Sequence, residues 1–111
     1  MTVTPKALIE AKQAENAQTT QYTADVVKTI IDKMTATNTT ANNVTFSVNI
    51  VAAGGSPTAS NRLISVKTIG PGETYPCSEV LGHVLERGDF ISTLAGTAAA
   101  ITLRASGREV T

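Results

Sequence analysis

The stretch NVTFSVNIVAAGG, residues 43 to 55, limits the possible fold more than any other part of the sequence. Apolar residues occupy every second position: Val44, Phe46, Val48 and Ile50. Polar residues fill the places between them: Thr45, Ser47 and Asn49. A period of two sends successive side chains to opposite faces of an extended chain, so this segment predicts a β-strand with one buried face. Two glycines then end the strand.

Other strand-like runs are separated by turn residues. We expect strands over residues 62–69, 73–86, 89–95 and 98–106, with a short last strand in GREVT. The run over 73–86 is expected to bend at Pro76 and Gly82, since proline removes a backbone donor from the ladder. About seven or eight short strands with turns between them predict an all-β fold: an antiparallel β-sandwich of jelly-roll or immunoglobulin-like type.

The run over residues 22–38 fits either a helix or a strand. Its large apolar residues recur at helical spacing: Val26, Val27, Ile30, Ile31 and Met34. Its β-branched residues lose side-chain freedom in a helix, and a turn cluster, NTTANN, follows it. We favour a strand, joined as a hairpin to the strand that begins near residue 44.

Residues 1 to 20 differ in composition from the rest, being rich in Ala, Gln, Glu and Lys. Thr4 followed by Pro5 suits a helix start, but the apolar face of such a helix is weak. We therefore divide the chain into an N-terminal arm or short helix at 1–20 and a β-sandwich domain at 21–111. The arm is expected to be ordered by a neighbouring chain, so that deleting it leaves the sandwich folded.

Two connections carry clear turn chemistry. The loop over residues 52–60 combines Gly, Ser and Pro and is expected to be exposed and mobile. In GPGE, residues 70–73, Pro71 presets its φ and Gly72 accepts a positive φ, which is the type II arrangement.

The charge balance excludes a general nucleic-acid binder. Nine Lys and Arg balance nine Asp and Glu among 111 residues, whereas such a binder needs a basic surplus. No apolar run approaches the roughly 20 residues that span a bilayer, and the N-terminal stretch lacks the apolar core of a signal peptide. The single cysteine suits a reducing compartment, so we expect the protein to be made and folded in a cytoplasm.

Cys77 and His83 are the first residues to consider for reactive chemistry. They stand six apart, which is roughly 20 Å along a straight strand, so they meet only if the chain folds back. One cysteine and one histidine give no metal-ligand spacing. We expect both to be buried or half-buried structural residues rather than a nucleophile and its base.

Three short motifs have the same amino-acid sequence as known recognition signals. Arg87-Gly88-Asp89 is an integrin-binding tripeptide, and two N-glycosylation sequons begin at Asn38 and Asn43. Glycine between charged residues is also an ordinary hairpin turn, and Asn-rich and Thr-rich chains produce sequons by chance. We interpret all three as turn or strand residues.

Nothing else in the sequence indicates catalysis. Nucleophile-elbow and phosphate-loop motifs are absent, so we expect no enzyme activity and no catalytic, cofactor-binding or metal site. Carbohydrate binding stays open only by analogy with other sandwiches, because a stacking platform needs aromatic residues. The chain has only four: Tyr22, Phe46, Tyr75 and Phe90.

Several of these runs together resemble the tailed-phage virion structural proteins. The segments are YTADVVKTIIDKMTATNTT, VTFSVNIV, LISVKTIGPGETY, VLGHVLERGDFIST and ITLRASGREVT. The matching turn and strand residues are Gly72, Glu73 and Thr74, then Leu85, Gly88, Asp89 and Ile91, and finally Ser106, Gly107 and Glu109. In length and layout the chain is most similar to the head decoration (staple or cement) proteins of short-tailed Salmonella-type phages.

This resemblance implies a function and partners. It implies a β-sandwich bound to the outer capsid surface of the virion, contacting the major capsid protein and pairing as a homodimer across local two-folds. Contacts are expected from residues 1–20 and from strand edges, with no nucleic acid, membrane or small-molecule partner. A neck, collar or tail-attachment protein is the first alternative, and a carbohydrate-binding module is the second.

Overall fold

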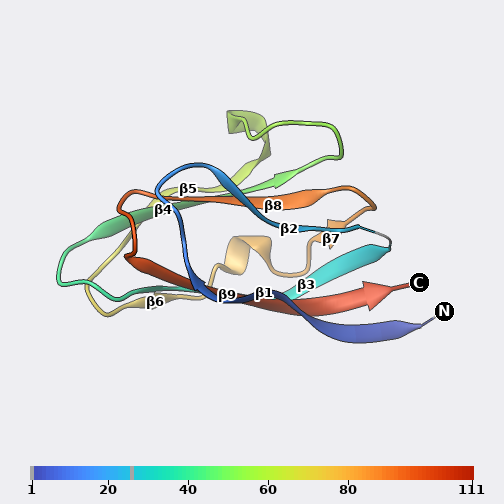
Figure 1. Ribbon diagram of the computed structural model, residues 1–111, viewed down its shortest axis with the longest axis horizontal. Coiled ribbons are helices and arrows are strands. Elements are labelled where there is room, and N and C mark those ends of the chain that lie inside the picture. The colour runs from blue at the N-terminus through green and yellow to red at the C-terminus, as the bar shows by residue number, and fades with distance from the viewer. Residues whose placement is uncertain (1, 26) are drawn as a thin grey trace.

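The computed structural model describes residues 2–25 and 27–111, which form two antiparallel sheets packed face to face (Figure 1). The strands are β1 (Val3–Gln13), β2 (Thr19–Thr23), β3 (Lys28–Asn38), β4 (Val44–Val51), β5 (Arg62–Ile69), β6 (Thr74–Tyr75), β7 (Val84–Leu85), β8 (Phe90–Ala95) and β9 (Ile101–Val110). Two 3-10 turns, η1 (Ala59–Asn61) and η2 (Ser78–Val80), are the only helical segments of the described residues. The predicted all-β sandwich is confirmed.

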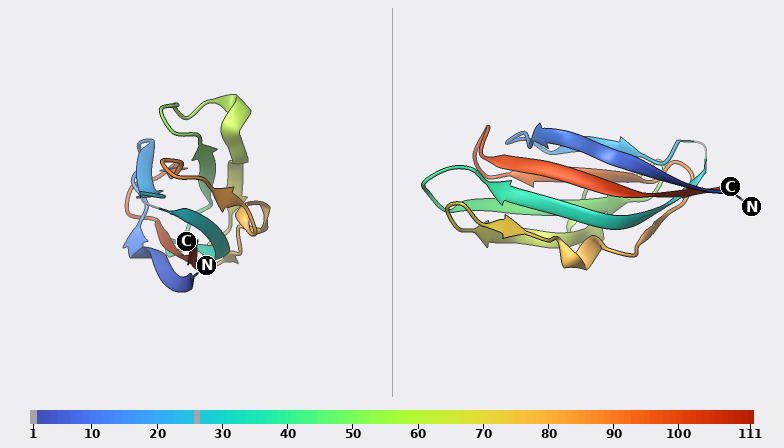
Figure 2. Two further views of the ribbon diagram at one scale, coloured as in Figure 1. Left: turned by 90° about the vertical axis from the view of Figure 1, so that its right-hand side faces the viewer. Right: turned by 90° about the horizontal axis from the view of Figure 1, so that it is seen from below.

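The two sheets use strands from all parts of the chain. The first sheet has the order β1-β9-β3-β6, with β7 also paired to β3, and the second has the order β2-β8-β4-β5. The free edges are therefore β1 and the β6–β7 side in the first sheet, and β2 and β5 in the second. The views in Figure 2 show the two layers edge-on and the strands of the first sheet side by side.

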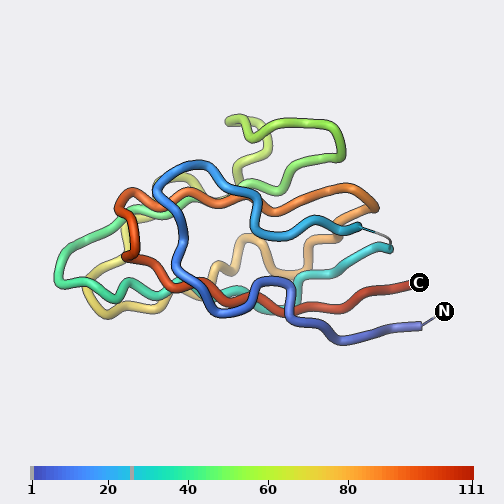
Figure 3. The backbone as a smooth tube through the Cα atoms, viewed as in Figure 1, coloured from blue at the N-terminus to red at the C-terminus, as the bar shows by residue number. Residues whose placement is uncertain are grey.

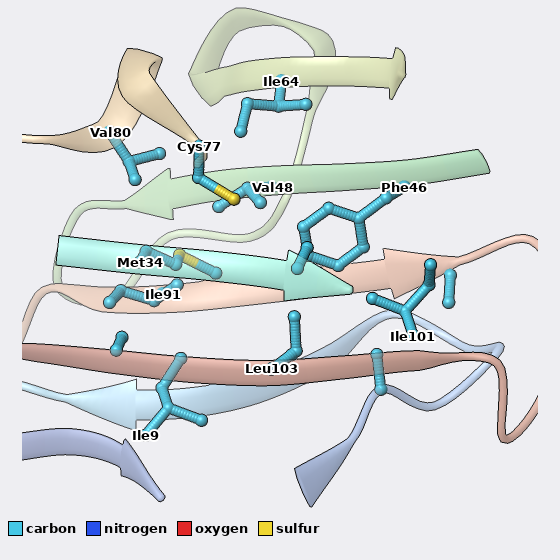
Figure 4. Close-up of a cluster of buried hydrophobic side chains, with 14 of the residues drawn as sticks. Ile9, Met34, Phe46, Val48, Ile64, Cys77, Val80, Ile91, Ile101 and Leu103 are labelled. Atoms are coloured by element: carbon cyan, nitrogen blue, oxygen red, sulfur yellow. The ribbon is translucent and has the colours of Figure 1, made fainter. Parts of the chain in front are cut away.

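The core lies between the sheets and takes side chains from both (Figure 4). Its largest fully buried members include Met34 and Leu103 from the first sheet and Phe46 and Ile91 from the second. Val80 of η2 closes the side of the core near β5. Removal of these apolar surfaces from water is the main force that holds the two sheets together.

The strand predicted from the alternation of residues 44–51 is β4. Val44, Phe46 and Val48 are buried as expected, and Ile50 is half-buried against the core. The structure also buries Ser47 and Asn49, which the alternation assigns to the solvent face. Asn49 is covered because the connection between β4 and β5 folds back over it, as described below.

The N-terminal segment is a strand of the sandwich. Residues 3–13 form β1, which pairs with β9 from Val3 opposite Val110 to Gln13 opposite Thr102. Of the two alternatives left open, an extended arm or a short helix, the helix does not form, and the segment is ordered by its own chain rather than by a neighbour. Leu8 and Ile9 are buried, so the structure does not support the expectation that the sandwich folds without residues 1–20.

The region over 22–38 contains the end of β2 and the whole of β3, which confirms the preference for strand over helix; the path of the chain through both strands can be followed in Figure 3. Val26, one of the residues at helical spacing, lies outside the described residues. The expected hairpin is wrong, because β3 belongs to the first sheet and β4 to the second. The Asn-Thr segment between them crosses from one sheet to the other instead of reversing within one.

The single bent strand expected over residues 73–86 is wrong, because the segment is not one continuous strand. The structure has two pairs of residues, β6 and β7, on either side of η2, and both pair with β3. Pro76 follows β6 directly, where a missing N–H ends the ladder. The GPGE turn is as expected, with φ of 72° at Gly72. The two segments expected near the C-terminus form one strand, β9.

The burial of Ile9 gives a direct test of whether β1 belongs to the folded domain. We expect Ile9→Ala to lower the free energy of unfolding by about 2 to 5 kcal/mol, because it leaves a cavity between the sheets. Glu10→Ala, at the exposed neighbouring position, should change it by less than about 0.5 kcal/mol. Urea unfolding followed by circular dichroism measures both, and equal small effects would mean that β1 does not pack as described.

Candidate functional site

A shallow polar groove lies between the edges of the two sheets, where the GPGE turn joins β5 to β6. Its volume is about 220 Å³, and it is lined by residues on both sides of the turn: Lys67, Thr68, Ile69, Glu73, Thr74 and Tyr75. The groove exists because β5 and β6 belong to different sheets and separate as they leave the turn.

Several polar groups of the groove have partners within the chain. The Lys67 ammonium lies 5.1 Å from the centroid of the Tyr75 ring, within the range of a cation–π contact. The Tyr75 hydroxyl donates a hydrogen bond to the Glu79 carboxylate, and the backbone N–H of Gly70 donates one to Glu73. These contacts engage Lys67, Glu73 and Tyr75 with groups of the same chain.

The titration of these groups follows from the same contacts. Burial, and after it the hydrogen bond to Glu79, raises the pKa of the Tyr75 phenol to about 12. The hydrogen bond from Tyr75 lowers the pKa of the Glu79 carboxyl. At neutral pH the phenol is thus protonated and the carboxylate charged, which is the pair of states that their hydrogen bond requires.

Cys77 and His83 do not form a reactive pair. Cys77 is fully buried beside η2 and lies in the core, and burial raises the pKa of its thiol to about 12. His83 is exposed, so its expected burial is wrong. Its backbone carbonyl accepts a hydrogen bond from Ile31, which places it at the β7 edge of the first sheet. The structural interpretation is confirmed for Cys77.

The Arg-Gly-Asp tripeptide is a turn that holds another loop. Gly88 has φ of 92° between β7 and β8. The Asp89 carboxylate accepts hydrogen bonds from the backbone N–H of Glu86, at 2.9 Å, and from that of Ala53, at 3.0 Å. Because both carboxylate oxygens are occupied by backbone donors, the interpretation of this motif as a turn is confirmed.

The sequon asparagine at position 38 is buried and joins the two sheets. Its side-chain amide donates hydrogen bonds to the carbonyls of Asn42, at 2.7 Å, and Ile69, at 2.9 Å. Its carbonyl oxygen accepts from the backbone N–H of Thr40. Asn43 lies in the exposed turn directly before β4. Both sequons are turn or strand positions, as interpreted from the sequence.

A polar cluster on the outer face of the second sheet was missed by the sequence analysis. The Asn49 amide nitrogen donates to the carbonyl of Thr58 at 2.9 Å and to the side-chain oxygen of Asn61 at 2.7 Å. Arg62 donates to the oxygen of the same Asn49 side chain, and Gln18 donates to Ser92 on the neighbouring strand. The cluster fixes the base of the loop between β4 and β5, which projects from the sandwich in Figures 1 and 2.

Among residues 2–25 and 27–111, no further layer covers the outer face of the first sheet (Figure 2). One row of side chains runs across its strands: Pro5, Arg108, Ile30 and Val84. Val3 and Val84 are each nearly half exposed, at 45% and 47%. Arg108 forms an ion pair with Asp32 at 2.9 Å beside this row, so the face mixes apolar side chains with charges.

The described residues offer no site for a metal ion, since no three His, Cys, Asp or Glu side chains lie together among residues 2–25 and 27–111. No helix of this part of the chain is long and apolar enough to span a bilayer.

Comparison with known proteins gives one weak structural similarity. No protein-family model matches the sequence, and no curated protein is significantly similar to it. A chain in the structure of infectious bursal disease virus, Gx strain, is similar with a TM-score of 0.38 and 13% sequence identity. The similarity covers 99% of this chain and 37% of the viral chain, so this chain spans just over a third of that length. A similarity at this level carries no argument about function.

The burial of Cys77 predicts that its thiol does not react in the folded protein. At pH 8 a pKa near 12 leaves almost no thiolate, and the side chain is out of contact with solvent. Ellman's reagent should therefore react with the native protein only at the rate of unfolding, and at once in guanidinium chloride. Ser56→Cys adds an exposed thiol as a control, and a native thiol that reacts as fast as this one would restore a nucleophile hypothesis.

The two hydrogen bonds of Asp89 predict that this residue stabilises the fold while its neighbour in the tripeptide does not. Asp89→Ala should lower the free energy of unfolding by about 1 to 3 kcal/mol, because two backbone donors lose their acceptor. Arg87→Ala should change it by less than about 0.5 kcal/mol. Urea unfolding gives both values, and a neutral Asp89→Ala would contradict the role of the carboxylate in holding the loop.

Proposed function

We propose that the protein is a phage capsid decoration (cement) protein, without enzyme activity, that binds the outside of the major capsid shell and stabilises it. The observation that carries the proposal is the outer face of the first sheet, which no other element of the described residues covers. The polar side chains Tyr75 and Asp89, in the groove and in a turn, instead contact groups of the same chain. Such a molecule offers a surface on which another protein can bind.

The residues on which the phage resemblance rests have structural reasons to be where they are. Gly72 and Gly88 adopt positive φ in the two turns named in the resemblance. Gly107 lies in β9, where an added Cβ would come within 2.1 Å of the Ile30 carbonyl oxygen. These residues are needed to build the turns and strands of the sandwich. They therefore support an architecture shared with the phage proteins more directly than they support a shared binding partner.

The mixed outer face of the first sheet suits contact with another protein. Val3, Ile30 and Val84 provide apolar area, and Arg108 with Asp32 provides polar groups that fix an orientation. We therefore place the shell contact on this face, which includes the outward residues of β1. The homodimer across local two-folds and the location on the outer capsid surface are part of the same proposal.

Stabilisation of a shell needs no catalytic group. A protein that binds only the assembled, expanded shell stabilises it by mass action, by an amount that grows with the logarithm of the ratio of its free concentration to its dissociation constant. The requirement on the protein is a rigid body with a fixed contact surface. Two sheets joined through one core meet this requirement.

The proposal predicts that purified virions carry the protein in numbers comparable with the major capsid protein. Gel densitometry of purified particles measures the ratio of the two bands. About six or twelve copies per particle would instead indicate a neck, collar or tail-attachment protein, since those positions follow the symmetry of the tail. Absence from the particle would contradict both proposals.

The contact surface is tested by adding purified protein to particles that lack it, followed by sedimentation. Val84→Asp replaces an apolar side chain of this row by a charge and should weaken binding to the shell by tenfold or more. Ser56→Asp, in the loop between β4 and β5, is the matched control and should bind like the unmodified protein. Equal binding by all three proteins would exclude the outer face of the first sheet as the contact.

A further inference from the structure

We propose that the bulge at Ser65 and Val66 closes the β5 edge of the second sheet to strand addition, the pairing of an edge strand with a strand from another chain. The inference concerns the folded protein in solution and is independent of the proposed function. It assigns a role to the most strained exposed position that the structure describes.

The bulge is visible in the register between β5 and β4. Lys67 pairs with Phe46, and Ile64 pairs with Val48. Two residues of β5, Ser65 and Val66, therefore stand opposite the single residue Ser47. A second irregularity follows at Leu63, so β5 pairs regularly only from Lys67 to Ile69. A bulge bends and twists its strand, which breaks the straight row of backbone groups that an added strand would need.

Val66 adopts this conformation at a cost in free energy. Its φ is 47°, a left-handed value that β-branched residues rarely adopt. Its side chain is 58% exposed, so packing does little to compensate for the strain. Its N–H donates to the Ser47 hydroxyl at 2.8 Å, and this hydroxyl is buried. The hydrogen bond to Ser47 thus stabilises the bulge. Backbone strain that is not offset by packing points to a function for the strained residue.

The other free edges are interrupted by different means. β1 contains Pro5 and two register shifts. β6 and β7 are two residues each, and Pro76 follows β6. β2 has five residues and a register shift. β5 has eight residues without a proline, and they include β-branched Ile64, Val66, Thr68 and Ile69. Its two charged residues are engaged by groups of the same chain, Arg62 by the Asn49 side chain and Lys67 by the Tyr75 ring. Without its bulges it would be a regular exposed edge, which is the kind that joins copies of a protein.

Deletion of Val66 removes the bulge and changes little else. In the folded protein Ile64 and Lys67 both stand opposite inward-facing residues of β4. Their residue numbers differ by three, whereas the numbers of residues on one face of a regular strand differ by an even number. Without Val66 they are two positions apart, so both keep their face and Ser65 pairs with Ser47. The deletion should therefore preserve the fold and relieve the strain.

The test compares three proteins by light scattering after size-exclusion chromatography, with circular dichroism to verify folding. The Val66 deletion should be folded and should elute at about twice the mass of the unmodified protein or more, because its edge accepts a second copy. Val66→Gly keeps the bulge and removes the strain, so it should keep the mass of the unmodified protein. Adding Thr68→Lys to the deletion should reverse the association, because a charge on the edge opposes pairing.

A folded Val66 deletion with the mass of the unmodified protein would overturn the proposal, and so would association by Val66→Gly. If the deletion does not fold, hydrogen exchange on the unmodified protein decides. The amides of Ser65 and Lys67 should exchange at the same rate over a wide range of protein concentration. Protection that grows with concentration would show that this edge pairs with another copy despite the bulge, and the proposal would fail.

Discussion

The first sheet depends on the pairing of β9 with β1 on one side and β3 on the other. Gly107 shows how close this pairing is, because its α-carbon leaves no room for a side chain beside the Ile30 carbonyl and the Leu8 side chain. Both neighbours are irregular at this point, with register shifts after Ala7 in β1 and after Ile31 in β3. Pairing of these three strands side by side forms the outer face of the sheet, with its row of apolar and charged side chains.

Most of the satisfied polar groups of the molecule serve to hold loops rather than to present chemistry. Asp89 holds the connection after β4, Asn49 holds its other end, and Asn38 joins the two sheets. Tyr75 and Glu79 engage each other in the groove between β5 and β6. Each of these residue types is common in binding and catalytic sites. Here their partners are backbone and side-chain groups of the same chain.

The sequence predicts the strands whose signal is local and misses those whose signal lies elsewhere in the chain. Phe46 and Val48 are predicted to be buried because the period of two is complete around them. Ile9 is not, because what buries it is pairing with β9, a strand that begins at residue 101. Asn49 appears solvent-facing in the pattern, since the loop that covers it cannot be inferred from alternation. The groove beside Tyr75 and the left-handed Val66 depend on register between strands, which no local pattern contains.

The pairing of β1 with β9 also has a consequence for folding during synthesis on the ribosome. β1 is synthesised before the other described strands, and the strand with which it pairs, β9, is the last of them. The backbone of β1 and the apolar side chains of Leu8 and Ile9 must therefore wait, unpaired, until translation has passed residue 110. A nascent chain stalled before that point carries an incomplete sheet, and its earliest segment is the part most open to capture by chaperones or proteases.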